Sequence, residues 1–109
     1  TPMADLTVRE AHDAWAAGRL VIVDCREESE HDTQHVAGTV LLPMSEMLAR
    51  IDEVPTDVDL AILCRSGNRS AQVADYLTRQ GPYGDVANIE GGIIAWAVEG
   101  LPYEGEPPR

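Results

Sequence analysis

The sequence predicts an α/β fold in which a central, mostly parallel sheet of about five strands is covered by helices on both faces. Two observations support this fold class. Short runs that are apolar throughout, without the alternation of a half-exposed strand, recur along the chain at residues 20–23, 40–42, 60–63 and 86–89. Segments with apolar residues at helical spacing lie between these runs, as they do in parallel sheets.

The first predicted elements are a helix and a buried strand. A helix is predicted over residues 8–17, because Thr7 and Glu10 have the spacing of a capping box and apolar residues then recur at helical spacing. Gly18 follows as a stop signal. The apolar run at residues 20–23 is then the first strand, and its lack of alternation indicates that both of its faces are covered.

The next segment is less regular. Residues 27–38 are polar and have no clear period, so we expect irregular structure with room for one helical turn. The second strand, residues 40–42, is stopped by Pro43. Ser45 can then cap a short helix that reaches Ile51.

The second half of the chain repeats the pattern of strand and helix. The strand at residues 60–63 leads into a helix that is predicted to begin near Ser70 and to stop at Gly81. A last strand at residues 86–89 and a short helix at residues 93–98 complete the predicted elements.

A single domain is predicted for residues 1–109, because this length suits one hydrophobic core and no repeat or low-complexity tract interrupts the pattern. Its core is expected to span residues 5–102. Residues 103–109 have no apolar period, and we expect them to form a flexible tail.

The composition argues against several classes of partner. The net charge of −11 and the pI of about 4.4 disfavour nucleic acid and anionic membranes. No apolar run approaches the roughly 20 residues of a membrane span and no signal peptide precedes the first helix, so we expect a cytoplasmic protein. The two cysteines lack CxxC spacing and the three histidines form no ligand pattern, so neither a metal site nor a cofactor is predicted.

The most informative segment is the polar loop at residues 64–70, Cys-Arg-Ser-Gly-Asn-Arg-Ser, between a predicted strand and a predicted helix. Small residues let backbone N–H groups converge, and a helix N-terminus adds partial positive charge, so such a loop stabilises an anion. The anion would be the thiolate of Cys64 and whatever it attacks. All eight basic residues are Arg, and two of them, Arg65 and Arg69, lie in this loop. Their position favours an anion site, and pairing with acidic neighbours is the alternative.

This loop resembles the active-site loop of single-domain rhodanese-type sulfurtransferases, and three further segments resemble that family's motifs in the same order. Residues 24–26, Asp-Cys-Arg, are similar to its Asp-Val-Arg, and residues 35–39, His-Val-Ala-Gly-Thr, to its His-Ile-Pro-Gly-Ala. Residues 90–96, Glu-Gly-Gly-Ile-Ile-Ala-Trp, are similar to its Gly-Gly-x-x-x-Trp segment. The resemblance covers residues 5–102. The departures from the family's pattern lie outside the thiol loop and are Cys25, His31, Ala37 and Thr39.

The resemblance implies a rhodanese-like fold and sulfur transfer by double displacement. Cys64 would take the outer sulfur of a donor such as thiosulfate as a persulfide and pass it to an acceptor such as cyanide, a small thiol or a protein thiol. A free Cys has a pKa of about 8.5, which a helix N-terminus and a nearby cation lower, so the absence of an adjacent histidine base matters little. The residues expected to hold the donor or the persulfide are Arg65, Ser66, Gly67, Asn68, Arg69 and Ser70.

Four residues outside the loop have expected supporting roles. Asp24 and Arg26 are predicted to be a buried pair that supports the loop. His35 is expected to be a hydrogen-bonded structural histidine. Cys25 is expected to pack in the core; to act as a resolving thiol for Cys64 it would need an adjacent strand end and Cα atoms within roughly 7 Å.

Two other functions remain open on the sequence. A Cys-dependent phosphatase or arsenate reductase has five residues between its Cys and Arg, whereas four separate Cys64 from Arg69, which favours sulfur over a phosphoryl group. The other alternative is a persulfide carrier or regulatory binding module that acts on a partner protein. The presence of Cys64 argues against an inactive binding domain, but it does not distinguish a carrier from a free-standing enzyme. The negative net charge slows the encounter with anionic thiosulfate at low salt, and this favours a neutral or protein-bound donor.

Overall fold

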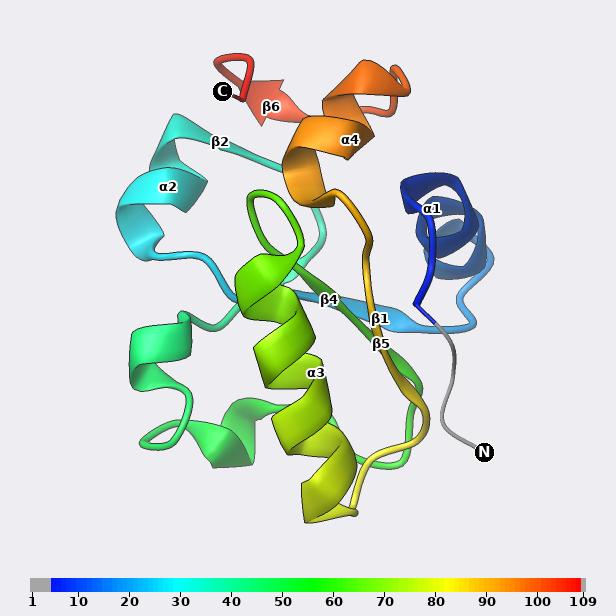
Figure 1. Ribbon diagram of the computed structural model, residues 1–109, viewed down its shortest axis with the longest axis vertical. Coiled ribbons are helices and arrows are strands. Elements are labelled where there is room, and N and C mark those ends of the chain that lie inside the picture. The colour runs from blue at the N-terminus through cyan, green and yellow to red at the C-terminus, as the bar shows by residue number, and fades with distance from the viewer. Residues whose placement is uncertain (1–4, 109) are drawn as a thin grey trace.

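The structure is a computed structural model that describes residues 5–108, and its centre is a four-stranded parallel sheet (Figure 1). The strands lie in the order β3-β1-β4-β5. Their bounds are Val21–Asp24 for β1, Val40–Leu41 for β3, Leu60–Leu63 for β4 and Val86–Asn88 for β5. The predicted α/β class is confirmed, with four strands in the sheet in place of about five.

Two further strands pair outside this sheet. Strand β2 (Gln34–His35) lies antiparallel to β6 (Glu104–Gly105). The backbone N–H of Glu106 also donates to Thr33 O over 2.9 Å. Residues 104–106, which we expected to belong to a flexible tail, thus pair through their backbone with residues 33–35, and such pairing leaves no mark in the side-chain pattern. Residues 1–4 and Arg109, which the predicted domain and tail include, lie outside the described residues.

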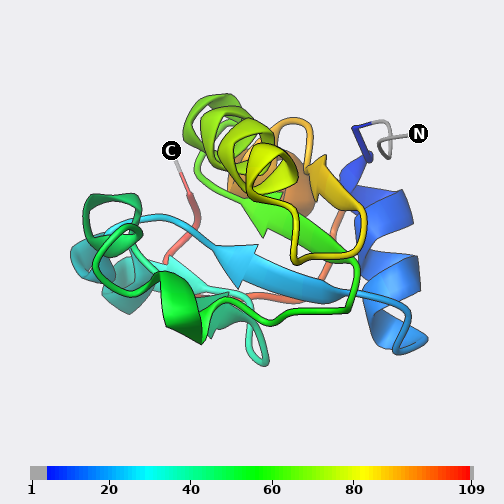
Figure 2. The ribbon, with the colours of Figure 1, turned by 90° about the horizontal axis from the view of Figure 1, so that it is seen from below.

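Helices cover both faces of the sheet, as predicted. Helix α3 (Asn68–Gln80) and two 3₁₀ turns, η1 (Met44–Glu46) and η2 (Ile51–Glu53), lie on one face, and α1 (Val8–Ala16) lies on the other (Figure 2). Helix α4 (Gly92–Val98) joins α1 on that second face. Within the part of the chain that the structure describes, no helix is long and apolar enough to cross a bilayer.

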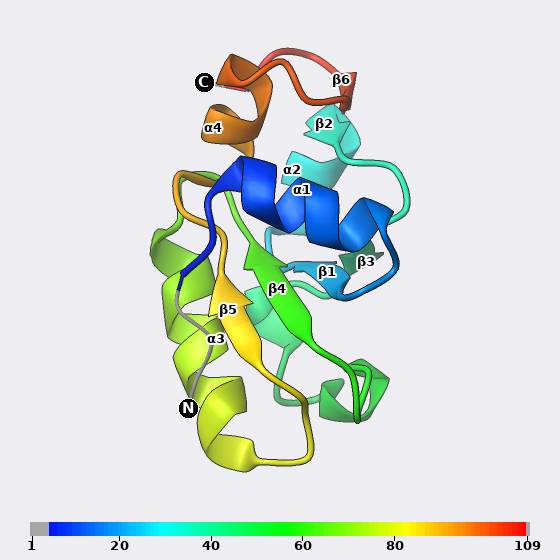
Figure 3. The same cartoon turned by 90° about the vertical axis from the view of Figure 1, so that its right-hand side faces the viewer.

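The alternation of side chains along β4 divides the core into two clusters. Leu60 and Ile62 pack with α3, whereas Ala61 and Leu63 pack with α1 and α4. All four residues of β4 are buried, which explains why the run shows no polar alternation. Figure 3 shows α4 and the β2–β6 pair gathered at one end of the sheet.

The predicted start of α1 agrees with the structure, whereas the next helical segments differ from the prediction. The capping box of α1 is present, since Glu10 N donates to Thr7 Oγ1 over 3.1 Å and Thr7 N donates to Glu10 Oε1 over 3.0 Å. Residues 27–38, expected to be irregular with one turn, contain helix α2 (Glu28–Thr33) and then β2. The short helix expected after Ser45 is instead formed by the 3₁₀ turns η1 and η2.

Helix α3 begins at Asn68, two residues before the predicted start at Ser70. Its N-cap is Gly67, whose φ of +100° lies in the left-handed region that favours glycine. A backbone conformation, and not a side-chain cap, therefore starts this helix, so a search for capping side chains placed the start too late. The helix ends at Gly81, as predicted.

Candidate functional site

The loop that carries Cys64 connects the end of β4 to the start of α3, at the carboxyl end of the sheet. Its backbone is anchored by the first amides of α4: Ile93 N donates to Cys64 O over 2.9 Å, and Ile94 N donates to Arg65 O over 3.2 Å. Amides in the first turn of a helix have no partner inside that helix, so here they hold the loop. A Cβ added at Gly92 would lie 2.5 Å from the Arg65 carbonyl carbon, so this approach requires glycine.

The Cys64 sulfur is buried within a cradle of hydrogen-bond donors. Gly67 N donates to Sγ over 3.0 Å, and Ser70 Oγ lies 3.2 Å from the same atom. Burial by itself raises the pKa of Cys64, but the hydrogen bonds from the Ser70 hydroxyl and from the amides of Ser70, Gly67 and Ser66 outweigh it and bring the pKa below its ordinary value. The site therefore favours the thiolate, which is the nucleophilic form.

Gly67 lies close to the segment that precedes α4. A Cβ at this position would lie 3.1 Å from Gly91 N, in addition to the strain of a left-handed backbone. The need for glycine at position 67 thus has a specific cause in the neighbouring segment before α4.

Asn88 also belongs to this site, although its role could not be predicted from the sequence. It is the last residue of β5, and its Oδ1 accepts a hydrogen bond from Ser70 Oγ over 2.5 Å. The available signal was a polar residue at the end of a buried strand run, at the edge of the sheet where Cys64 also lies. Its contact depended on the order of strands in the sheet, which one sequence does not supply.

The two arginines of the loop have different surroundings. Arg69 forms two bonds with the Glu30 carboxylate, Nη1 to Oε1 over 2.6 Å and Nη2 to Oε2 over 2.8 Å. This pair lowers the pKa of Glu30, first through the hydrogen bonds from Arg69. Arg65 makes no ion pair within residues 5–108 and lines a cavity. The alternative of pairing with an acidic neighbour thus describes Arg69 and not Arg65.

Asp24 and Arg26 form the buried pair that the sequence predicted. Arg26 Nη2 donates to Asp24 Oδ2 over 3.0 Å, and both side chains are at most 1% exposed. Arg26 also donates to the side-chain and backbone oxygens of Gln34, over 2.8 and 2.7 Å. The pair therefore ties the end of β1 to β2.

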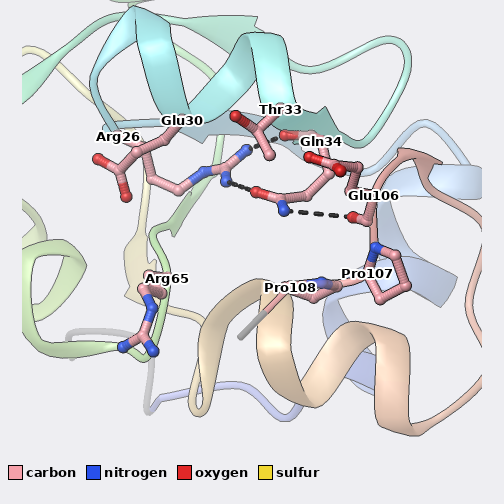
Figure 4. Close-up of a pocket in the computed structure, with 8 residues that line it drawn as sticks. All are labelled: Arg26, Glu30, Thr33, Gln34, Arg65, Glu106, Pro107 and Pro108. Atoms are coloured by element: carbon pink, nitrogen blue, oxygen red, sulfur yellow. Dashed lines mark hydrogen bonds between the residues drawn. The ribbon is translucent and has the colours of Figure 1, made fainter.

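A cavity of about 700 Å³ lies between the thiol loop, α2 and the C-terminal segment (Figure 4). The loop contributes Arg65, and the residues that line the rest are Arg26, Glu30, Thr33, Gln34, Glu106, Pro107 and Pro108. The C-terminal residues are held there because Gln34 Nε2 donates to Glu106 O over 3.2 Å. In the described range 5–108, His, Cys, Asp and Glu side chains form no group of three that could hold a metal ion.

His35 lies outside the residues that line this cavity. Its Nδ1 donates to His31 O over 3.1 Å, and its ring stacks on the His31 ring with centroids 4.3 Å apart. These contacts fit the expected structural role.

Cys25 lies beside Cys64 at the ends of adjacent strands. Asp24 and Leu63 are register partners in the β1–β4 pair, and Cys25 N donates to Leu63 O over 2.9 Å. Burial, followed by the charges of Cys64 and Asp24, raises the pKa of Cys25 to about 12. Cys25 is therefore a packed, protonated thiol at neutral pH, although the adjacency that a resolving thiol requires is present.

Comparisons with known proteins give one consistent result. A family model described as a rhodanese-like domain matches residues 7–99. A protein named sulfurtransferase from Allochromatium vinosum is 46% identical over 83 residues, which cover 76% of this chain and 77% of that protein. The probable adenylyltransferase/sulfurtransferase MoeZ of Mycobacterium tuberculosis is 34% identical over 103 residues, covering 89% of this chain and 25% of its own length. A rhodanese-related protein from Thermoplasma volcanium has a TM-score of 0.84 at 26% identity, over 95% of this chain and 100% of that one.

Proposed function

Because this chain belongs to the rhodanese-like family and is a sulfurtransferase, we propose that it moves a sulfane sulfur from thiosulfate, or a comparable donor, to a thiophilic acceptor through a persulfide on Cys64. One observation carries the proposal: the Cys64 sulfur accepts a hydrogen bond from Gly67 N over 3.0 Å in a loop whose next residue, Arg65, lines a cavity. The loop thus combines a nucleophile with donors that stabilise an anion, and a cavity for a ligand lies beside it.

In the first step, the Cys64 thiolate attacks the outer sulfur of the donor. A Cys64–sulfur bond forms, the sulfur–sulfur bond of thiosulfate breaks, and sulfite leaves with the electron pair. The low pKa of Cys64 supplies the thiolate, so no base has to remove a proton. The amides of Ser66, Gly67 and Ser70 then stabilise the anionic persulfide.

In the second step, the acceptor attacks the outer sulfur of the persulfide. The bond between that sulfur and Cys64 breaks, and Cys64 leaves as a thiolate. The hydrogen bonds that lower its pKa make it a good leaving group, so the same cradle serves both steps.

We assign the grip on the donor to Arg65. Its guanidinium makes no ion pair within residues 5–108, and a planar fork matches the oxygens of a sulfonate. Arg69, which the sequence analysis also assigned to the donor, would first have to give up its two bonds with Glu30. In this arrangement Arg69 instead holds α2 against the loop and so shapes the cavity wall.

Steady-state kinetics with thiosulfate and cyanide test this proposal. Double displacement predicts parallel double-reciprocal plots, and Cys64→Ala should have no turnover. Cys25→Val is the matched control, because it replaces the other buried thiol with a side chain of similar size outside the proposed chemistry. Activity that survives in Cys64→Ala would contradict the proposal.

A persulfide carrier that serves a partner protein is the second candidate. The net charge of −11 disfavours encounter with free anions, and the match to MoeZ, a far longer protein, supports a domain that works within a larger system. A carrier would form the persulfide but pass it slowly to cyanide or small thiols. A phosphatase is disfavoured, because Arg69 faces Glu30; turnover of an aryl phosphate without sulfur transfer would reverse that judgement.

A further inference from the structure

A chain of close contacts links Cys64 to Asn88 through the hydroxyl of Ser70. Ser70 Oγ lies 3.2 Å from Cys64 Sγ and 2.5 Å from Asn88 Oδ1. The three residues come from the end of β4, the first turn of α3 and the end of β5, and their exposures are 1%, 0% and 7%. Water therefore has little access to these contacts, and their hydrogen atoms must be shared among the three side chains.

The hydroxyl of Ser70 has one hydrogen, and two neighbours compete for it. An amide oxygen can only accept, so the contact with Asn88 Oδ1 uses the Ser70 hydrogen. Ser70 Oγ is then an acceptor toward Cys64, and the Cys64 thiol must donate. While the Asn88 oxygen holds the Ser70 hydrogen, Ser70 cannot give Cys64 the hydrogen bond that lowers its pKa, so this arrangement fits a protonated Cys64.

Ionisation of Cys64 reverses the direction of its hydrogen bond with Ser70. A thiolate can only accept, so Ser70 must turn its hydrogen toward Sγ. Ser70 Oγ and Asn88 Oδ1 would then be two acceptors in contact, which is costly for buried groups. Rotation of the Asn88 amide by half a turn removes the conflict, because its NH₂ group would then donate to Ser70 Oγ.

The surroundings permit this rotation. The backbone of Asn88 is held, since its carbonyl accepts from Leu6 N over 2.9 Å, so the side chain alone would move. Its Nδ2 makes no hydrogen bond to another side chain or backbone group among residues 5–108, so rotation breaks no second contact.

We propose that Asn88 is a positioning residue that acts on Cys64 through Ser70, with its amide oxygen facing Ser70 when Cys64 is a thiol and its amide nitrogen facing Ser70 when Cys64 is a thiolate or persulfide. The inference concerns the proton of Cys64 and rests on the proposed function only in treating Cys64 as the reacting thiol. Because an amide presents a donor and an acceptor of similar shape, Asn can support both states, whereas Asp can only accept.

Other ionisable groups also face Cys64 and must stay unchanged in a test. Cys25, which follows β1, and Arg69 of α3 interact with its charge, and Arg69 is paired with Glu30 of α2. Arg65 is its neighbour in the loop, and α4 contributes the uncharged residues Gly92 and Ile93. Variants at Asn88 and Ser70 leave all of these charged groups in place.

Two substitutions at position 88 should shift the pH midpoint of Cys64 alkylation in opposite directions. Asn88→Asp keeps the Ser70 hydrogen and adds a negative charge, so alkylation of Cys64 by iodoacetamide should become about tenfold slower at neutral pH and its pH midpoint should rise. Asn88→Ala removes the amide in both orientations and leaves Cys64 Sγ as the acceptor for the Ser70 hydrogen, which favours the thiolate, so the midpoint should fall. The rate is measured on the Cys64 peptide by mass spectrometry across pH, which separates it from Cys25.

A Ser70→Ala background supplies the control. If Asn88 acts through Ser70, the alkylation midpoint should be the same in Ser70→Ala and in the double variant Ser70→Ala with Asn88→Ala. Midpoints that move in the same direction in Asn88→Asp and Asn88→Ala, or an effect of Asn88→Ala that persists without the Ser70 hydroxyl, would overturn the inference.

Alkylation reports the proton of Cys64 whether or not sulfur is transferred, so failure of the proposed function would be seen separately, as absence of a persulfide. If Asn88→Asp does not fold, the effect of Asn88→Ala in the wild-type and in the Ser70→Ala protein still tests whether Asn88 acts through Ser70.

Discussion

Arg69 and Glu30 form a two-bond ion pair, with N–O distances of 2.6 and 2.8 Å, that joins the first turn of α3 to α2 at the edge of the cavity. Each side chain is about one-third exposed, so the pair is partly shielded from water. It places a guanidinium close to the thiol yet turns it toward a carboxylate. Under the proposed function, the pair leaves Arg65 as the arginine of the loop that would bind a donor.

Glu30→Ala should strengthen binding of thiosulfate. The substitution releases the Arg69 guanidinium for the sulfonate oxygens and removes a negative charge from the cavity wall. We expect the KM for thiosulfate to fall several-fold in the thiosulfate:cyanide assay. The control is Glu46→Ala, which removes one carboxylate from an exposed pair with Arg50. If KM stays the same or rises in Glu30→Ala alone, Arg69 does not become available to the donor.

The same pair should stabilise the fold in a pH-dependent way. The pKa of Glu30 is lowered in the folded protein, so its stabilisation is present above the ordinary Glu pKa and is lost as the pH falls through the lowered value. Glu30→Gln should therefore cost about 0.5–1 kcal/mol of unfolding free energy at neutral pH and less at acid pH. Urea unfolding at several pH values measures this difference. A cost that is constant with pH would mean that the carboxylate charge is not involved.

Arg26→Met should be strongly destabilising. It would leave the Asp24 carboxylate, which is 0% exposed, without its cation, and an uncompensated buried charge costs about 3–5 kcal/mol. Urea unfolding should show this loss, and the double variant Asp24→Asn with Arg26→Met should recover part of it. Equal stability of the single and double variants would show that the buried charge is not the cause.

Gly92→Ala should displace the thiol loop. A Cβ there would lie 2.5 Å from Arg65 C and O, and the φ of +58° adds backbone strain. Gly100→Ala is a matched control, because Gly100 has a φ of +75° and nothing within 4 Å of the added Cβ. The control should lose about 1–2 kcal/mol of stability and keep sulfur transfer, whereas Gly92→Ala should lose more stability and most of its activity. Similar behaviour of the two variants in unfolding and turnover would contradict the role of the close approach.

The sequence predicted those parts of the fold that side-chain pattern determines. The four apolar runs are the four strands of the sheet, because a strand covered on both faces needs apolar side chains at every position. The capping box at Thr7 marked the start of α1. Strand β6 was missed because both of its residues are exposed and it pairs with β2 through backbone groups, so it carries no apolar signal.

Part of the candidate site could also be predicted from the sequence. The thiol loop and the buried Asp24–Arg26 pair follow from short motifs, and both are present. The partner of Arg69 was not identified, because 19 acidic residues offered too many choices for one guanidinium. Asn88 was missed because its contact with Ser70 spans 18 residues and depends on β5 lying beside β4.

The most direct test of a Cys64 persulfide is the intact mass of the reduced protein after exposure to thiosulfate and removal of excess donor. We expect a gain equal to one sulfur atom, mapped to the Cys64 peptide, present in Cys25→Val and absent in Cys64→Ala. Addition of cyanide should remove the extra mass and release thiocyanate. An unchanged mass in fully reduced wild-type protein, or added sulfur on Cys25, would contradict a Cys64 persulfide as the intermediate.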